Sequence, residues 1–78
     1  MTARRLPSLK ARQIMRALER AGFVHVRSKG SHHVFEHPDD RTRRTVVSDH
    51  RGKDVPRGTL HAILDQAGLS IEEFLGLL

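Results

Sequence analysis

The chain has no cysteine among its 78 residues. This absence excludes disulfide bonds and thiolate metal sites, and it removes any compositional reason to expect an oxidising compartment. Long apolar runs are also missing, because nothing approaches the ~18 apolar residues of a membrane-spanning helix. Arg4 and Arg5 are not followed by the apolar segment of a secretory signal. We therefore expect a cytoplasmic protein that is neither membrane-spanning nor exported by a standard signal.

Aromatic residues are scarce, with three phenylalanines and neither tyrosine nor tryptophan. The phenylalanines are expected in the core, so the sequence does not predict an exposed aromatic platform on which nucleic acid bases could stack. A chain of this length forms one small domain, whose core supplies only about 3 to 5 kcal/mol of stability. Because this stability is small, we expect a partner that stabilises the domain by binding to it.

Positive charge is in excess. The 14 Lys and Arg residues outnumber the 9 Asp and Glu residues, which gives a formal net charge of +5, and the sequence pI is near 11.1. Eleven of the basic residues are arginine, whose planar guanidinium group matches phosphate oxygens. The charge favours a polyanionic partner, with nucleic acid first, although arginines can also form a merely solvated basic surface.

Apolar periodicity predicts three helices. The first extends from a cap at Ser8 to Gly22, the second from Pro56 to Gly68, and the third from a Ser70 capping box to the C-terminus. Their apolar stripes are Ala11, Ile14, Met15 and Leu18; Leu60, Ile63, Leu64 and Ala67; and Ile71, Phe74, Leu75 and Leu78.

Three extended segments lie between the first two helices, at residues 23–27, 32–37 and 44–48, and polar turns separate them. An antiparallel three-stranded sheet with the helices on one face is the simplest arrangement. We predict an α+β fold of order α-β-β-β-α with a short terminal helix. Residues 1–78 would form a single domain, with residues 1–7 as a flexible basic tail.

The segment from Lys29 to Asp39 has three histidines directly after a glycine turn. Because side chains alternate across a strand, His33 and Phe35 share one face while His32 and Val34 share the other. If Phe35 points into the core, His32 faces outward beside the turn. If Val34 is the inward residue, the assignment reverses.

Several motifs occur together in a distinctive order and spacing. They are Gly22-Phe23, the turn Gly30-Ser31-His32, Phe35, the pair His37-Pro38, His50 after the third strand, and "GTLHAILDQAG" at 58–68. Over about residues 8–70 the chain therefore resembles the HicA family of bacterial toxins, small RNA-cleaving proteins with a double-stranded-RNA-binding-domain-like fold. One departure is "VVSDH", where a proline is expected before the histidine.

The resemblance implies an endoribonuclease, or mRNA interferase, that inhibits translation and growth until a HicB-type antitoxin neutralises it. It also implies a catalytic histidine in the glycine turn. Most members have this histidine at the position of His32 and some have it one position later, so His33 is also a candidate.

The chemistry of RNA cleavage is consistent with such a site. RNA supplies its own nucleophile, the 2′-hydroxyl group, so a nuclease needs a base, an acid and cations for the phosphorane. Histidine suits proton transfer near neutral pH. We predict that His32 is the general base or acid, while Lys29 and the backbone amides of Gly30 and Ser31 hold the phosphate group.

Other contributors are open at this point. The opposite proton-transfer group could be His33, His50 or water. Further RNA contacts are predicted for Arg41, Arg43 and Arg44 in the turn before the third strand, for His50, and for Lys53 and Thr59 near the start of the second helix. The arginines could instead be a solvated loop tip, and Thr59 could instead cap the helix.

No metal or other cofactor is expected, because a structural zinc site usually needs four nitrogen or sulfur ligands and the chain has no thiolate. The alternative function is a non-catalytic module that holds double-stranded or structured RNA on the same surface. Positively charged side chains would suffice to bind RNA without cutting it, whereas a histidine in the glycine turn, which can transfer a proton, favours the nuclease. A DNA-binding helix-turn-helix is less consistent, because the strands separate the helices.

Overall fold

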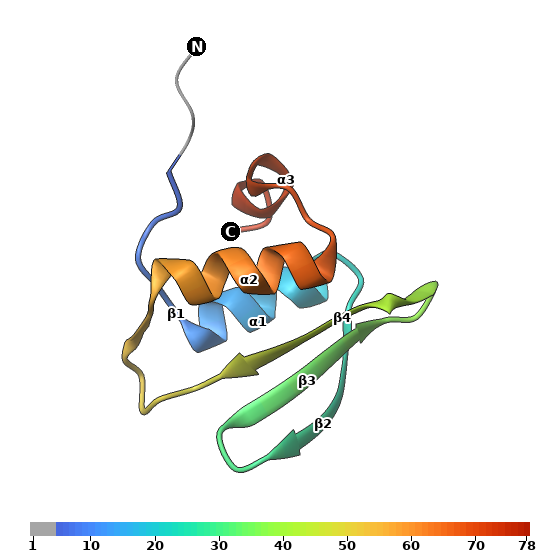
Figure 1. The fold of residues 1–78 in the computed structure, drawn as a ribbon, viewed down its shortest axis with the longest axis horizontal. Coiled ribbons are helices and arrows are strands. Elements are labelled where there is room, and N and C mark those ends of the chain that lie inside the picture. The colour runs from blue at the N-terminus through green and yellow to red at the C-terminus, as the bar shows by residue number, and fades with distance from the viewer. Residues whose placement is uncertain (1–4) are drawn as a thin grey trace.

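Residues 5–78 are described by the computed structural model, in which α1 and α2 lie on one side of a three-stranded sheet (Figure 1). The sheet is antiparallel and has the order β2-β3-β4. In chain order the elements are β1 (Leu9–Lys10), α1 (Ala11–Arg20), β2 (Val24–Lys29), β3 (His32–His37), β4 (Asp40–Ser48), β5 (Asp54–Val55), α2 (Arg57–Ala67) and α3 (Ile71–Leu75). The predicted α+β class is confirmed, and the arrangement is consistent with a double-stranded-RNA-binding-domain-like fold.

The core lies between the helices and one face of the sheet. Phe35 of β3 is 1% exposed and belongs to the same buried cluster as Ile14 and Leu18 of α1 and Leu60 of α2. Phe74 of α3 is also fully buried there. The prediction that Phe35 points inward is therefore confirmed. None of the helices formed by residues 5–78 combines the length and the apolarity needed to cross a membrane.

The opposite face of the sheet is open. Val34 is 7% exposed, but it lies outside the core cluster and its cross-strand partners are Arg27 and Val46. Val46 is 41% exposed and Val24 is 50% exposed. Val34 therefore owes its burial to its place in the central strand, not to the helices.

A β-bulge interrupts β2. Pairing with β3 shifts between His25, which lies opposite Phe35, and Arg27, which lies opposite Val34. The additional residue in β2 reverses the alternation of faces at that point. His25 and Ser28, which are three positions apart and would lie on opposite faces of a regular strand, consequently lie on the same face.

The start of the first helix differs from the prediction. α1 begins at Ala11 with Lys10 at the N-cap, not Ser8, because residues 9 and 10 form β1 and pair with β5. The backbone N–H of Lys10 donates to Oε1 of Gln13 at 2.9 Å, so the N–H of the N-cap residue is paired, but no side-chain oxygen caps the first turn of α1. The two-residue strands were not predicted, since two residues carry no detectable alternation.

Two other boundaries also differ. β4 begins at Asp40, so the predicted polar turn is limited to Pro38 and Asp39. The predicted flexible tail extends too far, because Leu6 is 3% exposed and belongs to the core. Residues 1–4 of that tail lie outside the described part of the chain.

The predicted end of the second helix and the predicted start of the third are confirmed, whereas α3 ends at Leu75 and does not reach the C-terminus as predicted. Gly68 ends α2 with a φ of +69°, a conformation that glycine adopts without strain. Ser70 and Glu73 form the capping box of α3: the N–H of Glu73 donates to Ser70 Oγ at 3.0 Å, and the N–H of Ser70 donates to Glu73 Oε1 at 2.9 Å.

Candidate functional site

His32 is the first residue of β3 and directly follows the turn that joins it to β2. In the sheet it lies opposite Lys29 on one side and Ser48 on the other, and it is exposed. Gly30 in the turn has a φ of +58°, and a Cβ atom built there would meet nothing within 4 Å. Glycine is therefore favoured at this position by its positive φ, and not by a steric clash that a side chain would cause. The turn places a histidine and a lysine next to one another on the open face of the sheet.

The loop between β4 and β5 lies against this turn. The N–H of Asp49 donates to the carbonyl oxygen of Ser31 at 2.9 Å. Within the loop, the N–H of Gly52 donates to Asp49 Oδ1 at 3.2 Å. Arg51 has a φ of +54°, which is uncommon for a residue with a Cβ atom and persists only when the surroundings fix it.

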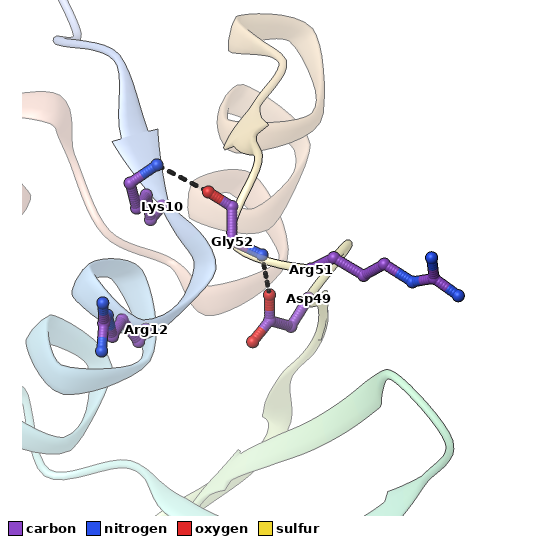
Figure 2. A pocket seen from close by; sticks show the side chains of 5 residues that line it. All are labelled: Lys10, Arg12, Asp49, Arg51 and Gly52. Atoms are coloured by element: carbon purple, nitrogen blue, oxygen red, sulfur yellow. Dashed lines mark hydrogen bonds between the residues drawn. The ribbon is translucent and has the colours of Figure 1, made fainter.

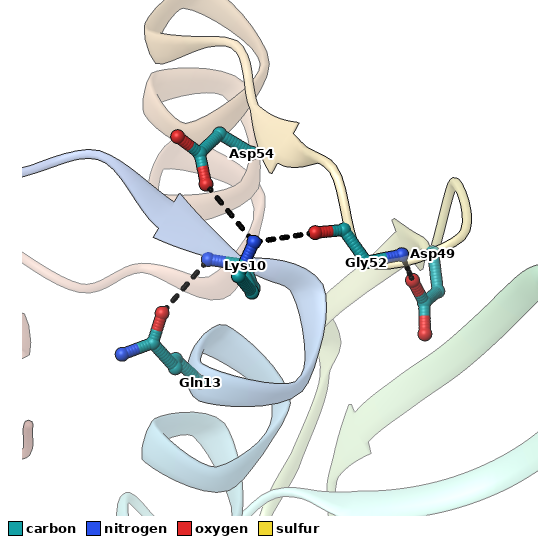
Figure 3. A network of polar contacts seen from close by, with 5 residues as sticks. All are labelled: Lys10, Gln13, Asp49, Gly52 and Asp54. Atoms are coloured by element: carbon teal, nitrogen blue, oxygen red, sulfur yellow. Dashed lines mark hydrogen bonds and ion pairs between the residues drawn. The ribbon is translucent and has the colours of Figure 1, made fainter.

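Lys10 holds the same loop from the other side (Figure 3). Its Nζ donates to the carbonyl oxygen of Gly52 at 2.6 Å and lies 3.6 Å from Asp54 Oδ1. The loop that carries His50 and Lys53 is therefore fixed at two points, one on β1 and one on the glycine turn.

Two hollows open beside this loop and share His50 and Lys53. The first, here called the turn hollow, is lined by Ser31, Asp49, His50, Arg51 and Lys53. The second, the helix hollow, is lined by Ser48, His50, Lys53, Asp54, Val55, Pro56 and Thr59. The structure thus brings His50, Lys53 and Thr59 to the end of the sheet where Lys29, Gly30, Ser31 and His32 lie.

Thr59 does not cap α2. The N-cap residue is Pro56, and no side chain caps that end of the helix. The exposed Thr59 side chain faces the helix hollow instead. The prediction of an RNA contact for Thr59 stays a prediction, and its capping alternative is wrong.

The three predicted arginines of β4 lie at the other end of the sheet. Arg44 pairs with Glu36, four residues from His32 and so about 13 Å along the strand, and its Nη1 lies 3.3 Å from Glu36 Oε2. Arg41 is exposed near the hairpin tip. The structure does not bring these arginines together with His32.

Arg43 has a structural role that the sequence did not suggest. Its Nε donates to the carbonyl oxygen of Ala67 at 2.7 Å, and its guanidinium carbon lies 5.3 Å from the centre of the Phe23 ring. The side chain also covers Gly68, where a Cβ atom would lie 3.1 Å from Arg43 Nε. Arg43 therefore ties β4 to the C-terminal end of α2.

Asp40 fixes the hairpin tip beside these arginines. Its Oδ1 accepts hydrogen bonds from Thr42 Oγ1 at 2.6 Å and from the N–H of Thr42 at 3.1 Å. The hydroxyl bond and then the backbone bond lower the pKa of Asp40 below its usual value.

His33 lies on the opposite face of the sheet from His32. Its Nδ1 is 3.0 Å from Ser28 Oγ, which is also 2.8 Å from His25 Nε2. The His25 ring stacks on Phe35 with the centroids 4.9 Å apart. His33 therefore belongs to a cluster that faces α1 and is separate from the turn hollow.

This cluster borders a groove between α1 and the sheet, here called the α1 groove. Its lining residues are Arg12, Met15, Arg16, Glu19, His25, His33 and Phe35. Sequence reasoning missed this site, because the bulge in β2 hides the relation between His25 and Ser28. The one signal in the sequence was the spacing of Arg12 and Arg16, because residues four positions apart share one face of a helix.

The remaining two histidines, His37 and His61, line neither the hollows beside the turn nor the α1 groove. The His37 ring packs edge-on against Phe23 at 5.2 Å, and its Nδ1 accepts the N–H of Asp39 at 3.2 Å. His61 is exposed on α2. Among residues 5–78, no three His, Asp or Glu side chains are placed to hold a metal ion.

A comparison with protein families gives one match over most of the chain. The model for the "HicA toxin of bacterial toxin-antitoxin" matches residues 11–69, a range that includes the glycine turn, the loop between β4 and β5 and the whole of α2. No curated protein sequence matches the chain.

Proposed function

The chain belongs to the HicA family and is thus the toxin of a toxin–antitoxin system, and from that premise we propose that it cleaves mRNA with His32 as the catalytic histidine. The observation that carries this proposal is the exposed position of His32 at the glycine turn, opposite Lys29 and beside the fixed loop that presents His50 and Lys53. These side chains combine a proton-transfer group with cations at one end of the sheet.

In the proposed reaction the 2′-hydroxyl oxygen of a nucleotide attacks the adjacent phosphorus atom, and the bond to the 5′-oxygen of the next nucleotide breaks. His32 either takes the proton from the 2′-hydroxyl group or gives one to the leaving 5′-oxygen. The products are a 2′,3′-cyclic phosphate and a 5′-hydroxyl end. A positioned histidine contributes about 10² to 10⁴-fold to such a step.

Stabilisation of the phosphorane comes from groups around His32. Lys29 supplies positive charge, and the backbone N–H groups of Gly30 and Ser31 would donate to the phosphate oxygens. Lys53 adds a second cation from the facing loop. Arg41 and Arg44, at the far end of the sheet, would contact RNA only outside the reacting nucleotides.

Three candidates were open for the opposite proton-transfer step. His33 faces α1, so it cannot reach the phosphate group that His32 contacts on the other face of the sheet. His50 lies in both hollows beside the turn. We assign the second role to His50 or to a water molecule in the turn hollow.

An antitoxin partner follows from the family, and we propose that it is of the HicB type and covers the turn hollow. Val46, which is exposed on the open face, lies opposite Val34, two residues from His32, so one partner could cover both Val46 and this site. Such a partner would also stabilise a domain with a small core.

The test is cleavage of end-labelled RNA in the presence of EDTA by the wild type and by the variants His32→Ala, His33→Ala and His61→Ala. His61→Ala is the matched control, because that histidine is exposed and lies on α2, away from the sheet. We expect cleavage to be lost only in His32→Ala, with thermal unfolding showing that each variant is folded. Loss only in His33→Ala would assign catalysis to the other face, and 5′-phosphate products would refute the proposed mechanism. A wild type that binds RNA and never cuts it would favour the non-catalytic RNA-binding module.

A further inference from the structure

The α1 groove contains a second group of histidines that the proposed reaction does not use. His25 and His33 have ring centroids 5.2 Å apart, and both are hydrogen-bonded to Ser28 Oγ. These bonds engage Nε2 of His25 and Nδ1 of His33. The other ring nitrogen of each histidine makes no hydrogen bond with any residue from 5 to 78. Each imidazole therefore keeps one nitrogen available to a ligand.

Ser28 limits how the two rings can be arranged. A serine hydroxyl has one proton to donate and two lone pairs to accept with. With both imidazoles neutral, Ser28 Oγ either accepts from both rings or accepts from one and donates to the other, according to the ring tautomers. With both rings charged, Ser28 accepts from both. The hydroxyl group thus fixes the orientation of the two rings in either state and presents them together.

The charge of the α1 groove favours an anion. Arg12 and Arg16 line it from one face of α1, and Glu19 is the single carboxylate among its lining residues. These side chains sum to one positive charge before either histidine is protonated. Within residues 5–78 neither arginine side chain forms a hydrogen bond or an ion pair, so both guanidinium groups are free to bind phosphate oxygens.

The α1 groove is also linked to the proposed catalytic site. Arg12 lines a further hollow together with Lys10, Asp49, Arg51 and Gly52 (Figure 2). Asp49 and Arg51 line the turn hollow as well. Figure 2 shows Lys10 and Arg12 on one side of this connecting hollow and Asp49 and Arg51 on the other. Three adjoining hollows therefore lead from the turn at Ser31 to α1, with basic side chains along them.

We propose that the α1 groove is a phosphate-binding subsite for the RNA strand, where His25, His33 and Arg16 hold a phosphodiester group away from the cleaved bond. This inference rests on the proposed function, which places the reacting phosphate at His32. The strand would pass from the turn hollow across Arg51 and Arg12 into the groove. His33 is then a binding residue for a flanking nucleotide, not a catalytic residue.

The first experiment uses an uncleavable 2′-O-methyl oligonucleotide of about ten nucleotides, which is within the range of single-strand site sizes. The ring C–H signals of the six histidines are followed by NMR. We expect the signals of His25, His33 and His32 to shift while that of His61 stays in place. A dinucleotide, which is too short to occupy both sites, should shift the signals at one site without the other.

Affinity measurements on variants give the matched test. Arg16→Gln and His33→Ala should each weaken binding of the oligonucleotide about 3- to 10-fold, and Arg16→Gln should lower the slope of log K against log salt by about 0.7. His61→Ala and Arg5→Gln, which remove an exposed histidine and an exposed arginine elsewhere, should bind like the wild type. Ser28→Ala keeps both imidazoles but frees the rings, and it should weaken binding less than His33→Ala.

Failure of the subsite and failure of the nuclease have different signatures. If the wild type cuts RNA but the His25 and His33 signals do not move and Arg16→Gln binds normally, the subsite is refuted and the nuclease stands. If the wild type does not cut RNA but inorganic phosphate shifts the His25 and His33 signals in an Arg16-dependent way, the groove binds phosphate and the nuclease is refuted. If the Arg16 and His33 variants lose affinity only for the antitoxin, the groove is a protein interface and the proposal is wrong.

Discussion

His32 and His33 are adjacent in the chain and lie on opposite faces of the sheet. His32 is exposed between Lys29 and Ser48, whereas His33 is hydrogen-bonded to Ser28 and faces α1. No single phosphate group can contact both side chains. The two histidines therefore need separate explanations: we propose His32 as the catalytic group and His33 as part of a flanking subsite.

The glycine turn offers a test that leaves both histidines in place. Gly30→Ala puts a Cβ atom at a residue with a φ of +58° but into open space, so the cost is backbone strain of about 1 to 2 kcal/mol. We expect a folded protein with a lower melting temperature and reduced cleavage, because the turn amides and His32 move. Gly58→Ala is the control: this glycine is in α2, and a Cβ atom there also meets nothing within 4 Å. It should raise stability by about 0.5 kcal/mol. If Gly30→Ala has a lowered melting temperature but, while folded, cleaves RNA as fast as the wild type, the turn geometry does not matter for cleavage.

Arg43 should affect stability more than activity. Arg43→Ala removes the hydrogen bond to Ala67 and the contact with Phe23, and we expect a loss of about 1 to 2 kcal/mol in the free energy of unfolding. Arg41→Ala, which removes an exposed arginine two residues away, should leave stability within about 0.5 kcal/mol of the wild type. Urea unfolding measures both. Equal stability of the two variants would contradict the structural role and favour RNA contact for Arg43.

These contrasts show how far the sequence could predict the site. Alternation along 32–37 placed His32 and His33 on opposite faces, because an apolar residue at Phe35 fixes the parity of the whole strand. The role of Arg43 depends on contact with Ala67, which is 24 residues away in sequence, and no local pattern reports such a contact. The cluster of His25 and Ser28 depends on a bulge, which changes the face of a residue without changing composition.

The capping box of α3 predicts a dependence of stability on pH. The backbone bond with Ser70, followed by the hydroxyl bond, lowers the pKa of Glu73 below its usual value. A carboxylate whose pKa is lowered on folding stabilises the folded state above its unfolded pKa, and this stabilisation is lost as the pH falls through the folded pKa. We expect Glu73→Gln to lower the melting temperature at neutral pH and to have a much smaller effect near pH 3. Ser70→Ala should reduce this difference between the two pH values. An effect of Glu73→Gln that is the same at both pH values would show that its charge has no role in the cap.

A substitution of Lys10 tests whether the loop between β4 and β5 must be held in place for activity. Lys10→Met removes the hydrogen bond to Gly52, which holds the loop against β1 (Figure 3). We expect a drop in cleavage of about tenfold or more, because His50 and Lys53 lose their fixed position and small displacements are costly in catalysis. The matched control is Asp54→Asn, which removes only the exposed ion pair with Lys10 at 3.6 Å and should change cleavage and stability little. A second effect must be separated from the loss of loop position. Lys10 also lies beside Arg12 on the proposed path of the RNA, where loss of a positive charge alone weakens RNA binding. Lys10→Met should therefore lower the rate even at saturating RNA, whereas a mere loss of charge would raise the RNA concentration needed for half-maximal rate and leave the maximal rate unchanged.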